Sequence, residues 1–140
     1  MTSFQALVRL LSARERTAAD LRARLARKGF SPSTIEASLE RAIALGYVDD
    51  LRAARAKATK ILAKGVSRAL IEQKLRQAGV PSRVVAEVMA EAPEDQALAQ
   101  TALARRFRSR LPSSERVARF LAGRGFDLEL IEDVVRKLAG

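Results

Sequence analysis

The hydrophobic positions of this 140-residue chain follow a helical period and return in three copies. Placing Gly29, Gly79 and Gly125 on one another gives offsets of 50 and 46 residues. The apolar residues around each glycine then coincide, and a hydroxyl residue stands twelve positions before it. The coinciding residues are Leu21, Ile71 and Val117; Leu25, Leu75 and Leu121; Phe30, Val80 and Phe126; Ile35, Val85 and Ile131; Leu39, Met89 and Val135; and Thr17, Ser67 and Ser113. Such a period indicates a repeat architecture.

Each copy predicts two helices that are joined at its glycine. The hydroxyl residue is a good N-cap for the first helix, and in the first copy Asp20 follows at the spacing of a capping box. Apolar residues four apart form one helical stripe, and the glycine can take the left-handed conformation that ends a helix. Ser31 with Pro32 then begins the next helix, as Asp127 does in the third copy, whereas the second copy has Pro81 there.

A further helix precedes this pair in each copy, within residues 3–11, 52–62 and 95–107. Its apolar stripe consists of Phe4, Leu7, Val8 and Leu11 in the first copy, Ala54, Ala58, Ile61 and Leu62 in the second, and Leu98, Ala102, Leu103 and Phe107 in the third. Acidic residues that suit a helix start open two of these helices, namely Asp49 with Asp50 and Glu94 with Asp95. No run alternates in polarity as a strand would.

The sequence therefore predicts an all-α fold of three tandem three-helix repeats, which we call repeat 1 (residues 1–48), repeat 2 (49–91) and repeat 3 (92–140). A unit of about 46 residues buries little core by itself, so neighbouring repeats must pack together. We expect an elongated, curved, right-handed array. The alternative is a single nine-helix globule in which the similarity of the copies is accidental.

Composition removes most kinds of catalytic and metal site. The chain has no Cys and no His, which excludes cysteine nucleophiles, Ser-His-Asp triads, His/Cys metal sites and disulfides. The acidic pairs Asp49-Asp50 and Glu132-Asp133 are interpreted as a helix cap and a solvated face. No apolar run nears the ~20 residues of a membrane span, and the N-terminus lacks a signal-peptide pattern. We expect a soluble, cytoplasmic, monomeric protein that is not an enzyme and uses no metal or cofactor.

Positive charge is concentrated on the first two helices of every repeat. The net charge of +10 favours nucleic acid, an acidic protein surface or anionic lipid as a partner, although solubility or an Arg-rich composition could also explain it. The net charge is +5 over residues 4–30, +7 over 51–80 and +6 over 96–126, while the third helices carry −1, −1 and −2. With five Phe and one Tyr, stacking on bases is expected to be a minor component of binding.

Two helices joined at a glycine also resemble a helix-turn-helix DNA reader. In that motif the second helix enters the major groove, but here that helix is acidic in every repeat and would face phosphates. The position four before the glycine, usually small in that motif, is Leu25, Leu75 or Leu121. Base-specific reading is therefore disfavoured, whereas the first two helices could follow phosphates without sequence preference.

The order of these features resembles the RecX family of bacterial recombination regulators. The resemblance rests on RTAADLRARLARKGF (16–30), IEASLERAIALGYVDDLRAARA (35–56) and AKGVSRALIEQKLRQAGV (63–80), and extends more loosely over repeat 3. The signature segment is GYVDD, with Gly46, Tyr47, Asp49 and Asp50. One departure is Ala53, where the family usually has an aromatic residue, and it thins the hydrophobic contact that this helix can make.

The resemblance implies a non-enzymatic modulator that binds along the RecA–DNA filament, in its helical groove, and inhibits filament growth, ATP hydrolysis and strand exchange. We expect weak, sequence-independent contact with single- or double-stranded DNA, and no membrane partner. The alternative is a basic nucleic-acid-binding protein without a recombinase partner. The candidate residues for contact with RecA or DNA are Arg24, Arg27, Lys28, Arg52, Arg55, Lys57, Lys60, Lys64, Arg68, Lys74, Arg76, Arg105, Arg106, Arg108 and Arg110.

Overall fold

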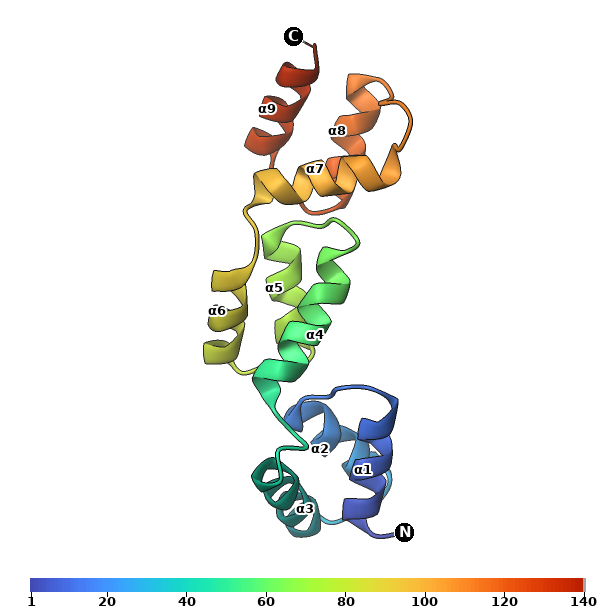
Figure 1. Ribbon diagram of the computed structural model, residues 1–140, viewed down its shortest axis with the longest axis vertical. Helices are drawn as coiled ribbons and strands as arrows, with labels where there is room; N and C mark the ends of the chain where they lie inside the picture. Colours follow the sequence, from blue (N-terminus) through green and yellow to red (C-terminus); the bar gives the residue numbers. More distant parts are fainter. Residues whose placement is uncertain (140) are drawn as a thin grey trace. The chain divides into compact units, whose positions relative to one another are not determined.

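The computed structural model describes residues 1–139, and these residues form helices and turns without any strand (Figure 1). The helices are α1 (Ser3–Ala13), α2 (Ala18–Arg27), α3 (Pro32–Ala44), α4 (Asp50–Leu62), α5 (Arg68–Gln77), α6 (Ser82–Glu91), α7 (Asp95–Arg106), α8 (Ser114–Gly123) and α9 (Leu128–Ala139). Three helices fall within each repeat. The predicted all-α fold and the order of its helices are therefore confirmed over this part of the chain.

The described residues pack as two compact units. The first comprises Met1–Lys57 and Leu75–Val88, and the second comprises Ala58–Lys74 and the chain from Met89 onward. Each helix of repeat 2 begins in one unit and ends in the other. Repeat 2 therefore contributes to both units.

The core of the first unit lies where α1, α2 and α3 meet (Figure 1). Leu7, Leu21 and Leu25 are completely buried there, and each contributes about 1.5–3 kcal/mol relative to an exposed side chain. The apolar stripes predicted on these helices thus form a core. The prediction was wrong for Val8, which is 38% exposed, because α1 turns Ala6 and Leu7 toward the core instead.

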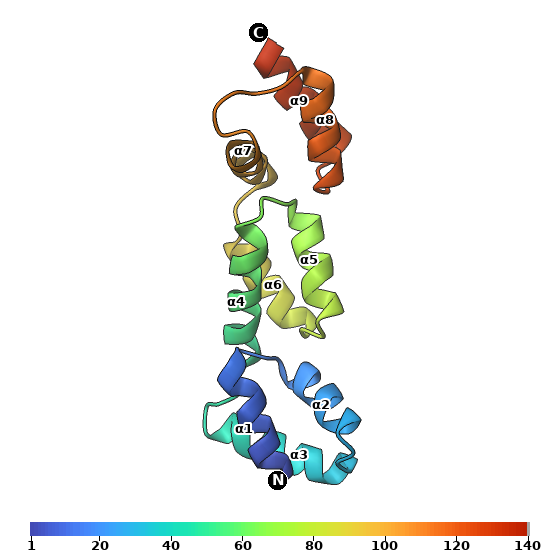
Figure 2. The ribbon, with the colours of Figure 1, turned by 90° about the vertical axis from the view of Figure 1, so that its right-hand side faces the viewer.

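In the second unit α8 and α9 lie side by side, as both views show (Figures 1 and 2). Val117 and Leu121 of α8 and Ile131 of α9 are buried, as their positions in the repeat predict. Further along α9 the buried residue is Val134, at 2% exposure, whereas the aligned Val135 is half-buried. The core-facing stripe of α9 therefore runs from Ile131 to Val134, three positions later, rather than to Val135, four positions later. Both spacings keep the two residues on one face of a helix.

The hydroxyl residues that recur in the sequence begin the second helix of each repeat. Thr17 Oγ1 accepts from the Asp20 backbone N–H at 3.1 Å, and Ser67 Oγ accepts from the equivalent N–H of Leu70 at 3.1 Å. Ser113 caps α8 in the same way. The capping box predicted for Asp20 does not form, because the Asp20 carboxylate binds two arginines, Arg16 and Arg24, instead.

The recurring glycines end these helices with one shared hydrogen-bond pattern. Gly29, Gly79 and Gly125 all have positive φ, which L side chains rarely adopt. The N–H of the apolar residue that follows each glycine donates to a carbonyl five residues earlier, at 3.2–3.3 Å. This is the closure of a Schellman motif, so the predicted helix stop is confirmed in every repeat.

Acidic side chains from one repeat complete a helix of the repeat before it. Asp50, the first residue of α4, accepts from the backbone N–H of Ala18 in α2 at 2.8 Å. Asp95, the first residue of α7, accepts from the backbone N–H of Arg68 in α5, also at 2.8 Å. Asp49 does cap α4, as predicted, through the Arg52 N–H at 3.1 Å. Asp50 was predicted to do the same and instead serves α2.

The repeated glycine turns form the other half of these contacts. A methyl group placed on Gly79 would lie 2.7 Å from Cβ of Ala19, and one on Gly125 would lie 2.6 Å from Oγ of Ser67. The same methyl group on Gly29 would meet nothing within 4 Å. Thus the glycine of a later repeat packs against the start of the second helix in the repeat before it. We call each set of acid, capped helix start and glycine an inter-repeat joint.

Candidate interaction surface

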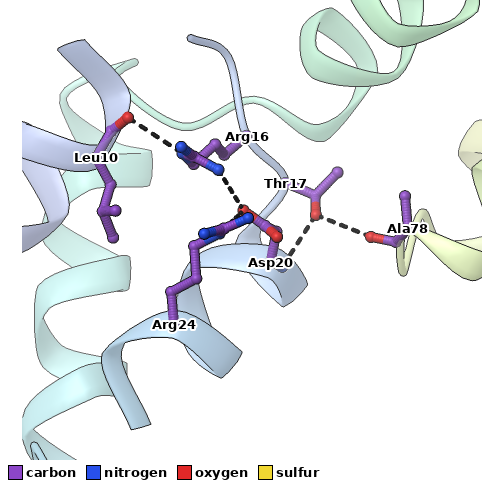
Figure 3. A network of polar contacts seen from close by, with 6 residues as sticks. All are labelled: Leu10, Arg16, Thr17, Asp20, Arg24 and Ala78. Atoms are coloured by element: carbon purple, nitrogen blue, oxygen red, sulfur yellow. Dashed lines mark hydrogen bonds and ion pairs between the residues drawn. The ribbon is translucent and has the colours of Figure 1, made fainter. Parts of the chain in front are cut away.

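Arg24, a candidate contact residue, belongs to a polar network inside the first unit (Figure 3). Its Nε donates to Asp20 Oδ2 at 2.9 Å, and Nη1 of Arg16 donates to the same oxygen at 3.2 Å. Arg16 also donates from Nε to the Leu10 carbonyl at 3.1 Å, which ties α1 to the start of α2. One carboxylate is therefore shared by two guanidinium groups, and Arg24 is partly neutralised where it stands.

A second ion pair joins α2 to α3 on the surface of the first unit. Nη2 of Arg22 lies 3.3 Å from Oε2 of Glu36, and Nε of Arg22 donates to the other carboxylate oxygen. The hydrogen bond from Arg22 lowers the pKa of the Glu36 carboxyl and raises the pKa of the Arg22 guanidinium. Both side chains are about half exposed, so the pair contributes modestly to stability.

Arg52 is the residue that organises the signature segment GYVDD. Its Nε donates to Glu15 at 2.8 Å, and its Nη2 donates to the carbonyls of Gly46 and Tyr47, each at 3.1 Å. Gly46 has φ +77° and ends α3, while the Tyr47 ring stacks on the Phe4 ring with centroids 6.3 Å apart. These contacts hold the GYVDD segment in place, and its two aspartates cap the helices α2 and α4, so the segment has a structural role. Ala53 beside it is 5% exposed.

Arg68 likewise has a structural role in the second unit. Its guanidinium donates to the carbonyls of Met89, Ala92 and Pro93 at 2.8, 2.8 and 3.0 Å. These carbonyls lie at and just beyond the C-terminal end of α6, where backbone acceptors lack helical partners. A cation there also suits the helix dipole. Arg68 is therefore bound to its own fold rather than free to meet a partner.

All the remaining candidates in repeats 1 and 2 are exposed. Two of them, Arg55 and Arg76, have interaction partners within the fold. The others are Arg27, Lys28, Lys57, Lys60, Lys64 and Lys74. The structure thus divides a set of candidates that charge counting had treated as equivalent.

The candidates in repeat 3 lie at the end of α7 and in the connection that leads to α8. All four are exposed, and Arg105 also donates to the carbonyl of Ala63, just after α4. Arg106 lies over the ring of Phe107, with its guanidinium carbon 5.1 Å from the ring centroid. That ring in turn contacts Phe120 of α8. Reasoning from sequence missed both phenylalanines as surface residues, because they lie 13 positions apart and no local pattern joins them.

Residues 1–139 contain no group of three or more His, Cys, Asp or Glu side chains that could hold a metal ion. None of the helices in that range is both long and apolar enough to cross a membrane.

The sequence of this chain is similar to those of known regulatory proteins. Residues 4–41 match the family described as RecX, first three-helix domain. The Regulatory protein RecX of Vibrio parahaemolyticus is 32% identical over 136 residues, covering 94% of this chain and 88% of the relative. That of Thermus thermophilus is 40% identical over 121 residues, covering 86% of this chain and 81% of the relative.

A solved structure supports the fold independently. The crystal structure of RecX from Lactobacillus salivarius matches with a TM-score of 0.76 and covers 98% of this chain and 94% of that one. The two sequences are 16% identical in that comparison. At so low an identity the match speaks for the fold alone, which is the all-α fold described above.

Proposed function

Since the chain belongs to the RecX family of regulatory proteins, we propose that it binds the RecA–DNA filament and inhibits RecA. Binding in the helical groove of the filament would slow filament growth, ATP hydrolysis and strand exchange. In this proposal the chain is a cytoplasmic monomer that acts by binding and catalyses no reaction. The observation that carries the proposal is the family relationship, which extends over 94% of the chain.

The contact surface we propose consists of the basic candidates that are exposed and that no carboxylate or carbonyl of residues 1–139 is seen to hold. They are Arg27, Lys28, Lys57, Lys60, Lys64, Lys74, Arg106, Arg108 and Arg110. Such residues suit acidic faces of RecA subunits or the phosphates of the DNA inside the filament. These residues are distributed over all three predicted repeats, residues 1–48, 49–91 and 92–140. Arg24, Arg52 and Arg68 are left out because their own fold already engages them.

The proposal is tested by following ATP hydrolysis by RecA filaments on single-stranded DNA while the chain is added in substoichiometric amounts. We expect the rate to fall as the chain accumulates on the filament. A suitable control is Arg22→Gln, which removes a surface arginine that is already paired with Glu36 and should leave inhibition unchanged. A hydrolysis rate that stays constant at every ratio would remove the proposal.

A second candidate function is sequence-independent nucleic-acid binding without a recombinase partner. The observation that favours it is the position of Arg106 and Arg116 over the ring of Phe107 in repeat 3. Within residues 1–139, neither arginine forms an ion pair with a carboxylate, unlike Arg16 and Arg22. DNA binding that falls steeply with salt, together with no recovery of RecA in a pull-down, would support this function over the first.

A further inference from the structure

Two phenylalanines of repeat 3 meet near the surface of the second unit. Phe107 follows the last turn of α7 and Phe120 lies in α8, and their ring centroids are 5.3 Å apart at an interplanar angle of 74°. Both residues are half-buried. Phe120 occupies the position that is Arg24 in repeat 1 and Lys74 in repeat 2. An aromatic residue has thus replaced a basic one in this repeat alone.

Three arginines surround this pair of rings. The guanidinium carbons of Arg106 and Arg116 lie 5.1 and 5.8 Å from the centroid of Phe107, and that of Arg124 lies 5.1 Å from the centroid of Phe120. These distances are within the range of cation–π attraction. We call these residues, Arg106, Phe107, Arg116, Phe120 and Arg124, the arginine–phenylalanine cluster.

The arginines of the cluster differ from several in repeat 1 in the groups that they contact. Within residues 1–139, neither Arg106 nor Arg116 forms an ion pair with a carboxylate, whereas Arg22 and Arg24 each do. A ring orients a guanidinium without neutralising it, and the N–H donors stay available for a ligand. Arg124 also approaches the carbonyl of Lys64 at 3.5 Å, which fixes one side of the cluster within the unit.

From this arrangement we infer that the arginine–phenylalanine cluster binds single-stranded nucleic acid, with guanidinium groups on phosphates and a base against the phenylalanine rings. Arginines without a carboxylate partner suit any polyanion, but two half-buried phenylalanines beside them favour one that also carries aromatic faces. A duplex hides its bases in the stack, and an acidic protein surface has no regular supply of them. The inference deepens the DNA-binding part of the proposed function and rests on it to that extent.

Tryptophan fluorescence gives a direct test because the chain contains no Trp. Phe120→Trp places one indole in the cluster and keeps an aromatic ring there. Phe4→Trp is the matched control, because it places one in repeat 1 beside Arg41, an arginine that is not a candidate contact residue. Adding oligothymidylate to the full-length protein should quench the first indole and leave the second unchanged. Equal quenching of both, or of neither, would overturn the inference.

Charge substitutions test the phosphate contacts separately. Arg106→Gln with Arg116→Gln removes two cluster arginines, and Arg9→Gln with Arg14→Gln removes two exposed arginines from repeat 1. We expect the cluster pair to weaken binding of a fluorescent oligothymidylate about tenfold and to reduce the salt slope by roughly 1.4, with little effect of the control pair. Equal losses from both pairs would mean binding spread over the surface, and would refute the cluster.

Competition identifies the class of ligand, and RecA separates this inference from the proposed function. Unlabelled single strands should displace the oligothymidylate far better than polyglutamate or a duplex of equal phosphate number. If polyglutamate or the duplex competes equally well, the inference is wrong. Since these measurements contain no RecA, a failure here with persistent inhibition of RecA ATPase leaves the proposed function standing. If the cluster binds single strands but the chain has no effect on RecA ATPase, the inference stands and the proposed function is wrong.

Discussion

A methyl group added at Gly125 would test the joint between repeats 2 and 3. The group would lie 2.6 Å from Oγ of Ser67, which caps α5 by accepting from the Leu70 N–H. Rotating the Ser67 side chain relieves the contact but removes that cap. Gly29→Ala is the matched control, because Gly29 has nearly the same positive φ and nothing near the added group.

The expected difference follows from these two sites. At both positions alanine pays about 1–2 kcal/mol for its left-handed conformation, offset by ~0.4–1 kcal/mol from a less flexible unfolded chain. Gly29→Ala should therefore cost about 1 kcal/mol. Gly125→Ala loses in addition the Ser67 cap, which contributes about 0.5–2 kcal/mol. The free energy of unfolding should fall further in Gly125→Ala by roughly 1 kcal/mol.

Urea unfolding followed by circular dichroism measures this difference. With a slope of about 2 kcal/mol per molar urea, the midpoint of Gly125→Ala should lie roughly 0.5 M below that of Gly29→Ala. A Ser67→Ala background sharpens the test, because the extra cost should largely disappear once the hydroxyl is gone. Equal midpoints for the two glycine variants, or an extra cost that persists without the hydroxyl, would refute the assignment of this contact.

Three other predictions concern charged side chains. Asp95→Ala should lower the free energy of unfolding by about 1–2 kcal/mol, because the Arg68 N–H loses its acceptor, and Asp95→Asn should cost less; thermal denaturation measures both. The pKa of the Glu36 carboxyl, measured by NMR titration, should lie below its ordinary value because Arg22 donates to it, and Arg22→Gln should restore the ordinary value. Because the folded pKa is depressed, the small stabilisation from this pair is present above the unfolded pKa and lost as pH falls through the folded one. Reversing three exposed lysines should weaken filament or DNA binding without loss of helicity, while reversing three acids of α9 should matter much less; equal losses would contradict the charge segregation. The lysines are Lys57, Lys60 and Lys64, and the acids are Glu129, Glu132 and Asp133.

The helix ends could be predicted from the sequence because their causes are local. A hydroxyl such as Thr17 caps an N–H three residues later, and a glycine such as Gly29 closes a hydrogen bond across five residues. The side chain of Asp50 could not be placed in this way. A local rule assigns this side chain to the helix that it begins. In the fold it accepts instead from the backbone N–H of Ala18, which lies 32 residues earlier in the chain.

The candidate surface was predictable as a sum of charges but not residue by residue. Arg52 and Arg68 have the same formal charge as Lys57, yet backbone carbonyls occupy their guanidinium groups. Such acceptors belong to turns and helix ends that are distant in sequence. In the same way, the pairing of Phe107 with Phe120 depends on how α7 and α8 pack. Counting aromatic residues led to the expectation that stacking is minor, and the count alone could not reveal that two of them meet.

The inter-repeat joints have a consequence for cutting or extending the chain. Because Asp50 and Asp95 each complete a helix of the preceding repeat, a cut between residues 48 and 49 would remove an acceptor that α2 needs. Repeats 1 and 2 should therefore lose stability as isolated fragments, and their unfolding should be coupled to their neighbours as in a one-dimensional lattice. A copy of repeat 2 inserted between repeats 2 and 3 would carry its own aspartate for the repeat before it and its own capping serine for the glycine of the repeat after it. Repeat 2 therefore supplies the aspartate, the capped helix start and the glycine from which each additional inter-repeat joint would form.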